Sequence, residues 1–243
     1  MVHSVSMNRI RKNNWFSIGF LIVFLAFAAT PVLAQTTQSV KKVQDTQASN
    51  KESGAEVLRK LSDNLFDSRE VKFNARFTIA NETTLNDGLF FAAKESGYLS
   101  LTGISEYQYD KENIFFYNIA TNELTIQKRK AGSANVFENP FGVFNTRDGV
   151  SVSDPSLEVL DGKRVKVLTL TPKGKANFKS AKIYLKEDLS VPQLIRLDII
   201  PKTKGGKCEI TVTSFSSKLS PERAAGYKID VSARKGVKIN DLR

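Results

Sequence analysis

The first regular pattern of hydrophobic and polar positions in the chain has the period of a helix. Residues 53–56 (SGAE) have the S-x-x-E spacing of a capping box, in which the two end residues cap each other's backbone amides. Val57, Leu58, Leu61 and Leu65 follow on one face of a helix, and charged side chains occupy the opposite face. The pattern predicts one amphipathic helix of about fourteen residues.

From residue 71 the hydrophobic period changes to two, which is the period of a strand. Val71, Phe73, Ala75, Phe77 and Ile79 alternate with polar residues, as in a half-buried antiparallel strand. The alternation recurs at residues 99–102, 124–127, 182–186, 195–199 and 210–213, with turn residues at 121–122, 161–162, 172–174 and 205–206. No helical pattern separates these strands. The sequence therefore predicts a mainly β fold with a helical component (α+β), built on one large antiparallel sheet.

Two segments interrupt the strand pattern. Residues 86–94 (NDGLFFAAK) are compatible with a loop or a short helix. Residues 134–145 (ANVFENPFGVFN) are apolar but contain a proline and a glycine, which argues against a central strand. The segment carries Phe137, Phe141 and Phe144, which need to be covered by other apolar side chains.

The N-terminus has the three regions of a secretory signal peptide. Basic residues at positions 9–12 precede an almost wholly apolar run at 15–29, and small residues at 31–34 resemble a cleavage site. An uncleaved anchor is the alternative, but the apolar run is short against the roughly twenty residues that span a bilayer. We therefore expect an exported protein. The predicted segments are a signal peptide (1–34), a disordered polar leader (35–52) and one folded domain (53–243).

Cleavage after Ala34 changes the chemistry that the chain has available. It leaves 209 of the 243 residues, and it removes the one His, the one Trp and both Met. A domain without His has no His general base, no His-dependent triad and no ordinary His-ligated zinc site. The one cysteine, Cys208, excludes an internal disulfide and a multi-cysteine metal site. Because Cys208 alternates with Ile210 and Val212, we predict a buried structural thiol.

The carboxylates give no positive sign of a catalytic site. Asp87, Asp148 and Asp161 lie beside glycines in predicted turns, and Asp198 lies within a strand alternation, so local turn or surface chemistry explains each of them. Two carboxylates that the fold brings together are not excluded, because their separation is spatial. We predict no catalytic residue, no metal site and no cofactor.

Basic residues cluster at the predicted turns, at 128–130, 173–175, 202–207 and 234–235. Cleavage would remove three positive charges from the net charge of +11 and leave +8. Such a charge attracts anionic membrane surfaces or acidic partners, but solubility and protection of strand edges by lysine explain it equally well. Nucleic acid is not expected as a partner, because the domain is exported and has no matching motif.

The apolar face of the predicted sheet needs a cover. The segments with apolar surface to spare are the helix at 53–66 and the phenylalanine-rich segment at 134–145. If they pack tightly, the result is an ordinary core. If they pack loosely, the result is a hydrophobic pocket with a lid, suited to an acyl chain. The pattern by itself leaves both interpretations open.

Several segments, taken in order, resemble the LolA-like periplasmic carriers of outer-membrane lipoproteins. They are the helix, the strand ending ARFT at 75–78, GYLSL at 97–101, NPF at 139–141, LTLTPK at 168–173 and the C-terminal GVKINDLR at 236–243. The resemblance covers the chain from about residue 53 to the end. Tyr227 departs from the phenylalanine expected there, no proline precedes the final Gly-Val, and the sheet arginine that holds the family's lid has no clear match.

The resemblance implies an unclosed, strongly curved antiparallel β-barrel covered by short helices. It implies a periplasmic carrier, not an enzyme, that holds the acyl chains of lipoproteins in a hydrophobic cavity and moves them from the inner to the outer membrane. The implied partners are acylated lipoproteins, an ATP-driven inner-membrane release complex and an outer-membrane acceptor, with the carrier a monomer. The alternative is an envelope sensor or scaffold domain of the same fold that binds a protein or lipid without transport.

On this interpretation the inward-facing strand residues form the acyl-binding wall. The choice of face is a hypothesis, because a one-residue slip reverses it. The predicted wall consists of Phe77, Ile79, Leu99, Leu101, Ile126, Leu168, Leu170, Ile183, Leu185, Leu197 and Ile199. The predicted lid consists of Leu58, Leu61, Leu65, Phe137, Phe141 and Phe144.

Overall fold

The structure is a computed structural model that describes residues 52–130, 135–145, 149–174 and 176–243. The predicted signal peptide and all but the last residue of the predicted leader lie outside the described residues. Within the described part, no helix is long and apolar enough to cross a membrane.

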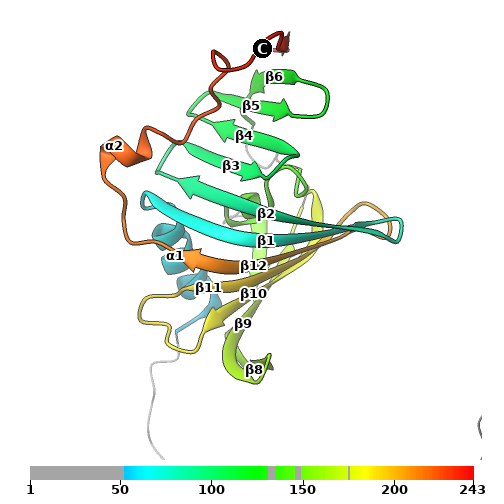
Figure 1. Ribbon diagram of the computed structural model, residues 1–243. Helices are drawn as coiled ribbons and strands as arrows, with labels where there is room; N and C mark the ends of the chain where they lie inside the picture. Colours follow the sequence, from blue (N-terminus) through cyan, green and yellow to red (C-terminus); the bar gives the residue numbers. More distant parts are fainter. Residues whose placement is uncertain (1–51, 131–134, 146–148, 175) are drawn as a thin grey trace, which may run out of the picture. The chain divides into compact units, whose positions relative to one another are not determined.

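Strands dominate the described part of the chain (Figure 1). The helical elements are α1 (Gly54–Leu65), the 3-10 helix η1 (Pro140–Asn145) and α2 (Pro221–Ala224). The strands are β1 (Arg69–Ile79), β2 (Glu82–Ala92), β3 (Gly97–Leu101), β4 (Ser105–Tyr109), β5 (Asn113–Asn118), β6 (Glu123–Lys128), β7 (Val150–Val152), β8 (Ser156–Leu160), β9 (Lys163–Pro172), β10 (Phe178–Lys186), β11 (Leu194–Pro201), β12 (Lys207–Phe215) and β13 (Lys238–Asp241).

All thirteen strands belong to one curved sheet that does not close into a barrel (Figure 1). Its order is β13-β6-β5-β4-β3-β2-β1-β12-β11-β10-β9-β7, with β8 also paired to β9. Every neighbouring pair is antiparallel except β13 and β6. The predicted fold class, an unclosed and curved antiparallel sheet with short helices, is confirmed.

The two faces of the sheet follow from the alternation along β1. Val71, Phe73 and Ala75 are buried, and the polar residues between them point the other way. We call the buried side, which α1 and η1 cover, the inner face, and the opposite side the outer face. Residues paired directly across antiparallel strands share a face, so the register of each pair assigns the faces of all the antiparallel strands.

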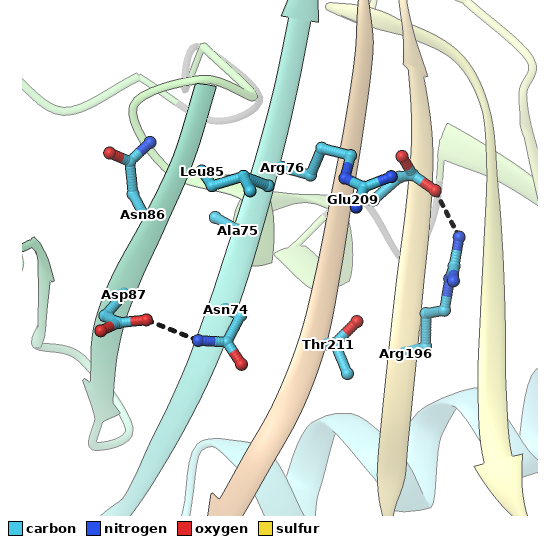
Figure 2. A pocket seen from close by; sticks show the side chains of 9 residues that line it. All are labelled: Asn74, Ala75, Arg76, Leu85, Asn86, Asp87, Arg196, Glu209 and Thr211. Atoms are coloured by element: carbon cyan, nitrogen blue, oxygen red, sulfur yellow. Dashed lines mark hydrogen bonds and ion pairs between the residues drawn. The ribbon is translucent and has the colours of Figure 1, made fainter. Parts of the chain in front are cut away.

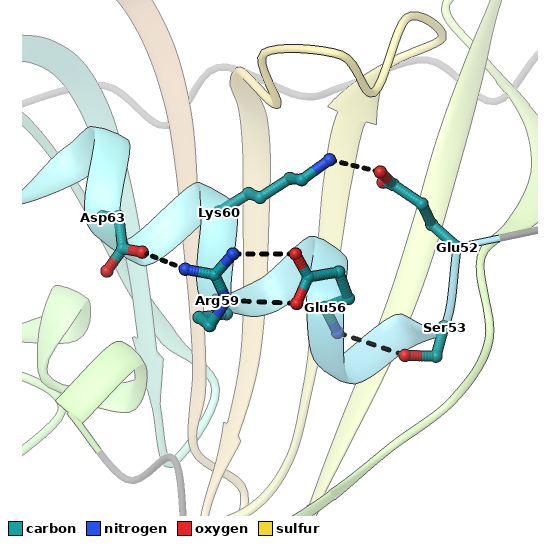
Figure 3. A network of polar contacts seen from close by, with 6 residues as sticks. All are labelled: Glu52, Ser53, Glu56, Arg59, Lys60 and Asp63. Atoms are coloured by element: carbon teal, nitrogen blue, oxygen red, sulfur yellow. Dashed lines mark hydrogen bonds and ion pairs between the residues drawn. The ribbon is translucent and has the colours of Figure 1, made fainter.

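Helix α1 begins as the capping box predicts. The Ser53 hydroxyl accepts a hydrogen bond from the Glu56 amide at 3.3 Å, which satisfies one of the free amides of the first turn. Twelve residues are helical, and the helix ends where the Phe66 amide donates to the Ser62 carbonyl. On the solvent side, Arg59 bridges Glu56 and Asp63, as Figure 3 shows.

Residues 86–94 do not form a loop or a helix, because most of them belong to β2. The alternation is hidden in the sequence since Phe90 and Phe91, which are neighbours on opposite faces, are both buried. Phe90 packs in the inner core. Phe91 is covered on the outer face by the C-terminal part of the chain, where the Tyr227 ring stacks on it at 4.5 Å. The burial of Phe91 on the outer face therefore depends on the tertiary structure.

The C-terminal residues 216–243, which we call the C-terminal strap, cross the outer face from β12 to β6 (Figure 1). The Tyr227 hydroxyl donates to Glu70, and the Arg234 guanidinium pairs with Glu106 while lying 3.9 Å from the Tyr117 ring centre. Strand β13 then pairs with β6 in parallel and covers its edge. The strap therefore buries outer-face aromatics that would otherwise be exposed.

Candidate functional site

The inner face forms a continuous apolar wall across both halves of the sheet. Nine of the predicted wall residues belong to one buried core cluster: Phe77, Leu99, Leu101, Leu168, Leu170, Ile183, Leu185, Leu197 and Ile199. Adjacent strands bring them into register, since Ile183 lies opposite both Leu168 on β9 and Leu197 on β11. The wall therefore depends on strand pairing between segments far apart in the sequence.

Two predicted wall residues lie elsewhere. Ile126 is paired with Phe115, which faces away from the core, so Ile126 belongs to the outer face. The alternation around it predicted the strand correctly but not the face, because period two fits either side. Ile79 is the last residue of β1 and is 45% exposed, so it lies at the sheet's end and not within the wall.

Helix α1 lies against the inner face with its apolar side. Leu58, Leu61 and Leu65 are all buried in the core cluster, together with Val57. The N-terminus of the helix approaches β7 so closely that a Cβ at Gly54 would overlap the Ser153 carbonyl oxygen. A glycine is required there because the helix backbone contacts the chain beyond β7 directly.

The phenylalanine-rich segment provides the second part of the cover. Phe141 stacks on Phe90 with ring centres 4.2 Å apart and meets Phe73 edge-on at 5.3 Å. Phe144 is also buried in the core, while Phe137 is partly buried and contacts Phe77 at 5.9 Å. The residues proposed for the lid therefore all pack against the inner face.

Polar groups occur at the contact between the cover and the sheet. The Ser62 hydroxyl of α1 is buried and has no hydrogen-bond partner among the described residues. Tyr107 on β4 hydrogen-bonds to the Asn139 side chain, and burial raises the pKa of Tyr107 to about 12. The Asn139 amide oxygen is buried without a described partner. Each unpaired buried group costs free energy where the cover packs on the sheet, and so weakens that contact.

Sequence reasoning missed Tyr107 and Tyr109, which belong to the inner core cluster. The alternation in residues 105–109 (SEYQY) indicates a strand. It does not show which face of the strand is buried, because tyrosine occurs both at protein surfaces and in cores. Phe73 and Phe90 were also absent from the predicted wall. Both rings contact Phe141, so they belong to the surface that the cover meets.

A separate polar pocket of about 420 Å³ lies on the outer face, over β1, β2, β11 and β12 (Figure 2). Arg196 binds Asp198 through two hydrogen bonds, of 2.6 and 3.1 Å, and also pairs with Glu209. Asp87 accepts a hydrogen bond from Asn74 at 2.5 Å. The charges of this pocket are therefore largely paired with each other.

Arg76 lies on the outer face beside this pocket, where it is directly opposite Glu209 of β12 in the strand register. It therefore does not face α1 or η1. Partial burial disfavours the charged form of Glu209, but the hydrogen bond and charge of Lys207 and the charges of Arg196 and Arg76 hold the carboxyl pKa below its ordinary value. A carboxylate kept ionised in this way is not available as a general acid at neutral pH.

Cys208 lies on the inner face, between Phe77 of β1 and Ile199 of β11. It is fully buried, and burial raises the pKa of its thiol well above the ordinary range. The thiolate is the nucleophile, so Cys208 is held in its unreactive form. The prediction of a buried structural thiol is confirmed.

No family model matches the chain, and no curated protein matches it in sequence. Solved structures do match. An uncharacterised conserved protein from Thermus thermophilus aligns over 76% of this chain and 97% of its own, with 12% identity and a TM-score of 0.48. A LolA superfamily protein from Nitrosomonas europaea aligns over 74% and 99%, with 10% identity and a TM-score of 0.42.

A putative outer-membrane lipoprotein-sorting protein domain from Vibrio parahaemolyticus aligns over 70% of this chain and 95% of its own, with 11% identity and a TM-score of 0.43. All three TM-scores lie below 0.5, so what the protein does has to be argued from its own geometry.

Proposed function

We propose that the protein binds acyl chains between the inner face of the sheet and the cover formed by α1 and residues 135–145, and that it carries lipoproteins between the membranes of the cell envelope. One observation carries the proposal. Within the described chain, a broad apolar wall is covered by one twelve-residue helix and by residues 135–145, which include one short 3-10 helix. Both contact the wall mainly through apolar side chains, which an acyl chain can replace.

The polar side of α1 is arranged so that the helix can separate from the sheet at low electrostatic cost. Arg59 pairs with Glu56 and Asp63, and Lys60 pairs with Glu52, all within the helix and the residues before it (Figure 3). These pairs move with the helix and remain intact when it is displaced.

Hydrogen bonds between described residues also join α1 to the sheet's loops. The Gly54 amide donates to Asp154 Oδ1 at 3.2 Å, and the Asn64 side chain donates to the Pro192 carbonyl at 3.0 Å. Each is worth about 0.5–1.5 kcal/mol. They position the closed helix but do not lock it.

The magnitudes of the competing apolar contacts are comparable. Exposing the four buried apolar side chains of α1 (Val57, Leu58, Leu61 and Leu65) costs about 6–12 kcal/mol, at roughly 1.5–3 kcal/mol each. Burying an acyl chain of about sixteen CH₂ groups gains about 13 kcal/mol, at roughly 0.8 kcal/mol per group. Helix α1 and an acyl chain then compete for the same wall with free energies of the same order, which suits a carrier that must also release its cargo.

The test is binding of a fluorescent fatty acid to the wild type and to two matched variants. Phe141→Leu weakens the cover by removing the stack on Phe90, whereas Phe91→Leu removes a buried ring on the outer face. We expect Phe141→Leu to raise the affinity for the probe about two- to tenfold, and Phe91→Leu to leave it unchanged. No binding by the wild type or by Phe141→Leu would refute acyl binding and leave an ordinary core.

Carriage of lipoproteins is the finer part of the proposal and needs its own assay. Spheroplasts energised with ATP are incubated with the tagged protein, and acylated lipoproteins bound to the tag are measured in the soluble fraction. A soluble complex that needs both ATP and the protein supports carriage. Acyl binding without such release would favour the envelope sensor or scaffold instead.

A further inference from the structure

The two ends of the sheet differ in the charge of their turns. Because the strands are antiparallel, successive hairpin turns alternate between the ends. Five connections between consecutive strands lie at one end, which we call the basic end, and the described chain also enters β7 there at Gly149. They are residues 80–81, 102–104, 119–122, 173–177 and 202–206. None of these residues is Asp or Glu, although Glu82 and Glu123 are the first residues of the strands that follow two of the turns. Three lysines of the described chain, Lys173, Lys202 and Lys204, lie among the turn residues.

The opposite end, which we call the acidic end, has lysines that are accompanied by acids. Its connections are residues 93–96, 110–112, 161–162 and 187–193, which contain Glu95, Asp110, Glu112, Asp161, Glu187 and Asp188. The sequence shows basic residues at many turns. Only the strand order shows that the turns without acids lie at the same end.

Three turns of the basic end are in contact or close to one another. The Lys202 amide donates to the Asn177 carbonyl at 3.1 Å, which joins the turn after β11 to the turn after β9. A Cβ at Gly205 would lie 3.8 Å from the Ala80 amide nitrogen, at the tip of the β1–β2 hairpin. Figure 1 shows this hairpin beside the turn between β11 and β12. The lysines therefore form one surface.

The lysines of this surface are free to bind an external anion. Lys173, Lys202 and Lys204, and also Lys179 near the start of β10, are exposed, and none forms an ion pair with an acid in the described chain. Lys207 differs, since it pairs with Glu209 at 3.0 Å. Three lysines in two adjacent turns and Lys179 at the start of β10, none of them paired with a described acid, make an electrostatic site for a negatively charged surface.

Exposed isoleucines accompany the lysines. Ile79, Ile104, Ile119 and Ile200 all lie in or next to the turns of the basic end, and each is between 38% and 45% exposed. An acidic protein or a free anion would be recognised by charge and would gain little from these side chains. A membrane interface takes both groups, because lysines contact the lipid phosphates while aliphatic side chains enter the boundary with the acyl region.

We propose that the basic end docks on membrane surfaces that contain anionic lipids. The cover ends at the same place, since Phe137 contacts Phe77 near the end of β1 and lies 3.4 Å from where a Cβ of Gly206 would be. Docking therefore places one edge of the cover next to the lipid. The inference stands on the charges and isoleucines of the turns, and it adds a location to the proposed function without depending on it.

The first test compares vesicle binding of two variants that lose the same number of charges. One carries Gln at Lys173, Lys179, Lys202 and Lys204, and the control carries Gln at Lys94, Lys111, Lys163 and Lys186, which are exposed lysines of the acidic end. The wild type and both variants are prepared as the host exports the chain. Their binding is measured by flotation with phosphatidylcholine vesicles that do or do not contain phosphatidylglycerol.

We expect the wild type to bind the anionic vesicles and to release at high salt. The basic-end variant should lose at least about tenfold in partition, because each lysine near an anionic surface contributes about fivefold. The control variant should lose less than about twofold. Equal losses in both variants, or no binding of the wild type to anionic vesicles at low salt, would overturn the proposal.

A tryptophan probe tests the orientation directly. Ile104→Trp places a fluorophore at the basic end, and Val191→Trp places one at an exposed position of the acidic end. Trp15, the one native tryptophan, lies in the predicted signal peptide, so any emission from it is the same in both variants. Anionic vesicles should shift the emission of Ile104→Trp to the blue and leave Val191→Trp unchanged, whereas the reverse pattern would overturn the proposal. If docking fails while fatty-acid binding persists, only this inference is lost.

Discussion

At the scale of single residues, two glycines decide how aromatic rings pack on the inner face. Gly88 lies opposite Phe73, and a Cβ there would be 2.3 Å from the Phe73 ring. Gly97 lies opposite Tyr109, and a Cβ at Gly97 would be 2.5 Å from the Tyr109 ring. In both cases the ring occupies the place that a side chain would need. A glycine within a strand pattern indicates such a close approach, but the sequence does not identify the ring.

We predict that Gly88→Ala lowers the free energy of unfolding by about 1–3 kcal/mol, because the methyl group displaces the Phe73 ring from a packed core. Urea unfolding measures the change. Gly149→Ala is the control, since no atom of the described chain lies within 4 Å of the added atom, and its change should stay below about 0.5 kcal/mol. Similar losses in the two variants would show that the ring contact is not the cause.

Cys208 gives a prediction about pH. Burial raises its pKa in the folded protein, whereas an exposed cysteine titrates near about 8.5. Above that pH the unfolded chain binds fewer protons than the folded chain, so the thiol's contribution to stability is complete below about pH 8.5 and is lost as pH rises. Compared with Cys208→Ala, the wild type should lose stability more steeply above about pH 8.5, by up to about 1.4 kcal/mol per pH unit.

The alkylation rate provides a second readout for Cys208. Iodoacetamide should not modify the native protein between about pH 7 and 9, and it should modify the urea-unfolded protein readily. Rapid modification of the native protein would mean that the strand pairing around Cys208 opens far more often than its burial indicates.

At the scale of elements, the C-terminal strap shows why β2 was not recognised. The strap buries Phe91 from outside, so β2 carries apolar residues on both faces and loses the alternation that identifies a half-buried strand. The strap is held at Tyr227, whose pKa rises to about 12 through burial and the neighbouring Glu70 carboxylate.

We predict that Tyr227→Phe lowers the free energy of unfolding by about 1 kcal/mol, because it removes the hydrogen bond to Glu70 and keeps the stack on Phe91. In a Glu70→Gln background the same substitution should cost clearly less, so that a double-mutant cycle by urea unfolding reports a coupling between the two residues. Additive losses would mean that the hydroxyl bond does not hold the strap.

At the scale of the whole molecule, the cover and the basic end have complementary roles. In the proposed function, the cover would keep the apolar wall away from water until a competing acyl chain is available. The turns of the basic end would hold the protein where acyl chains are found and would place Phe137 of the cover nearest to them. The fatty-acid and vesicle experiments above measure these two properties separately, since Phe141→Leu alters the cover and the lysine variants alter the turns.

The sequence by itself determined the elements whose pattern is local. The capping box and apolar stripe of α1, the alternation of β1 and the burial of Cys208 could all be predicted because one solvated side leaves a clear period. Nine of the residues predicted for the wall lie in the buried core for the same reason, because the inner faces of most strands alternate with polar residues on the outer face.

Only the tertiary structure decided the features that depend on which strands are neighbours. Ile126 lies on the outer face because of its pairing with Phe115, and Phe91 is buried because the strap crosses it. The basic end exists because strand order collects turns from distant parts of the chain. Period two is the same on either face of a sheet, and a turn carries no local signal of the turns beside it. Contacts of this kind are therefore settled by packing and topology.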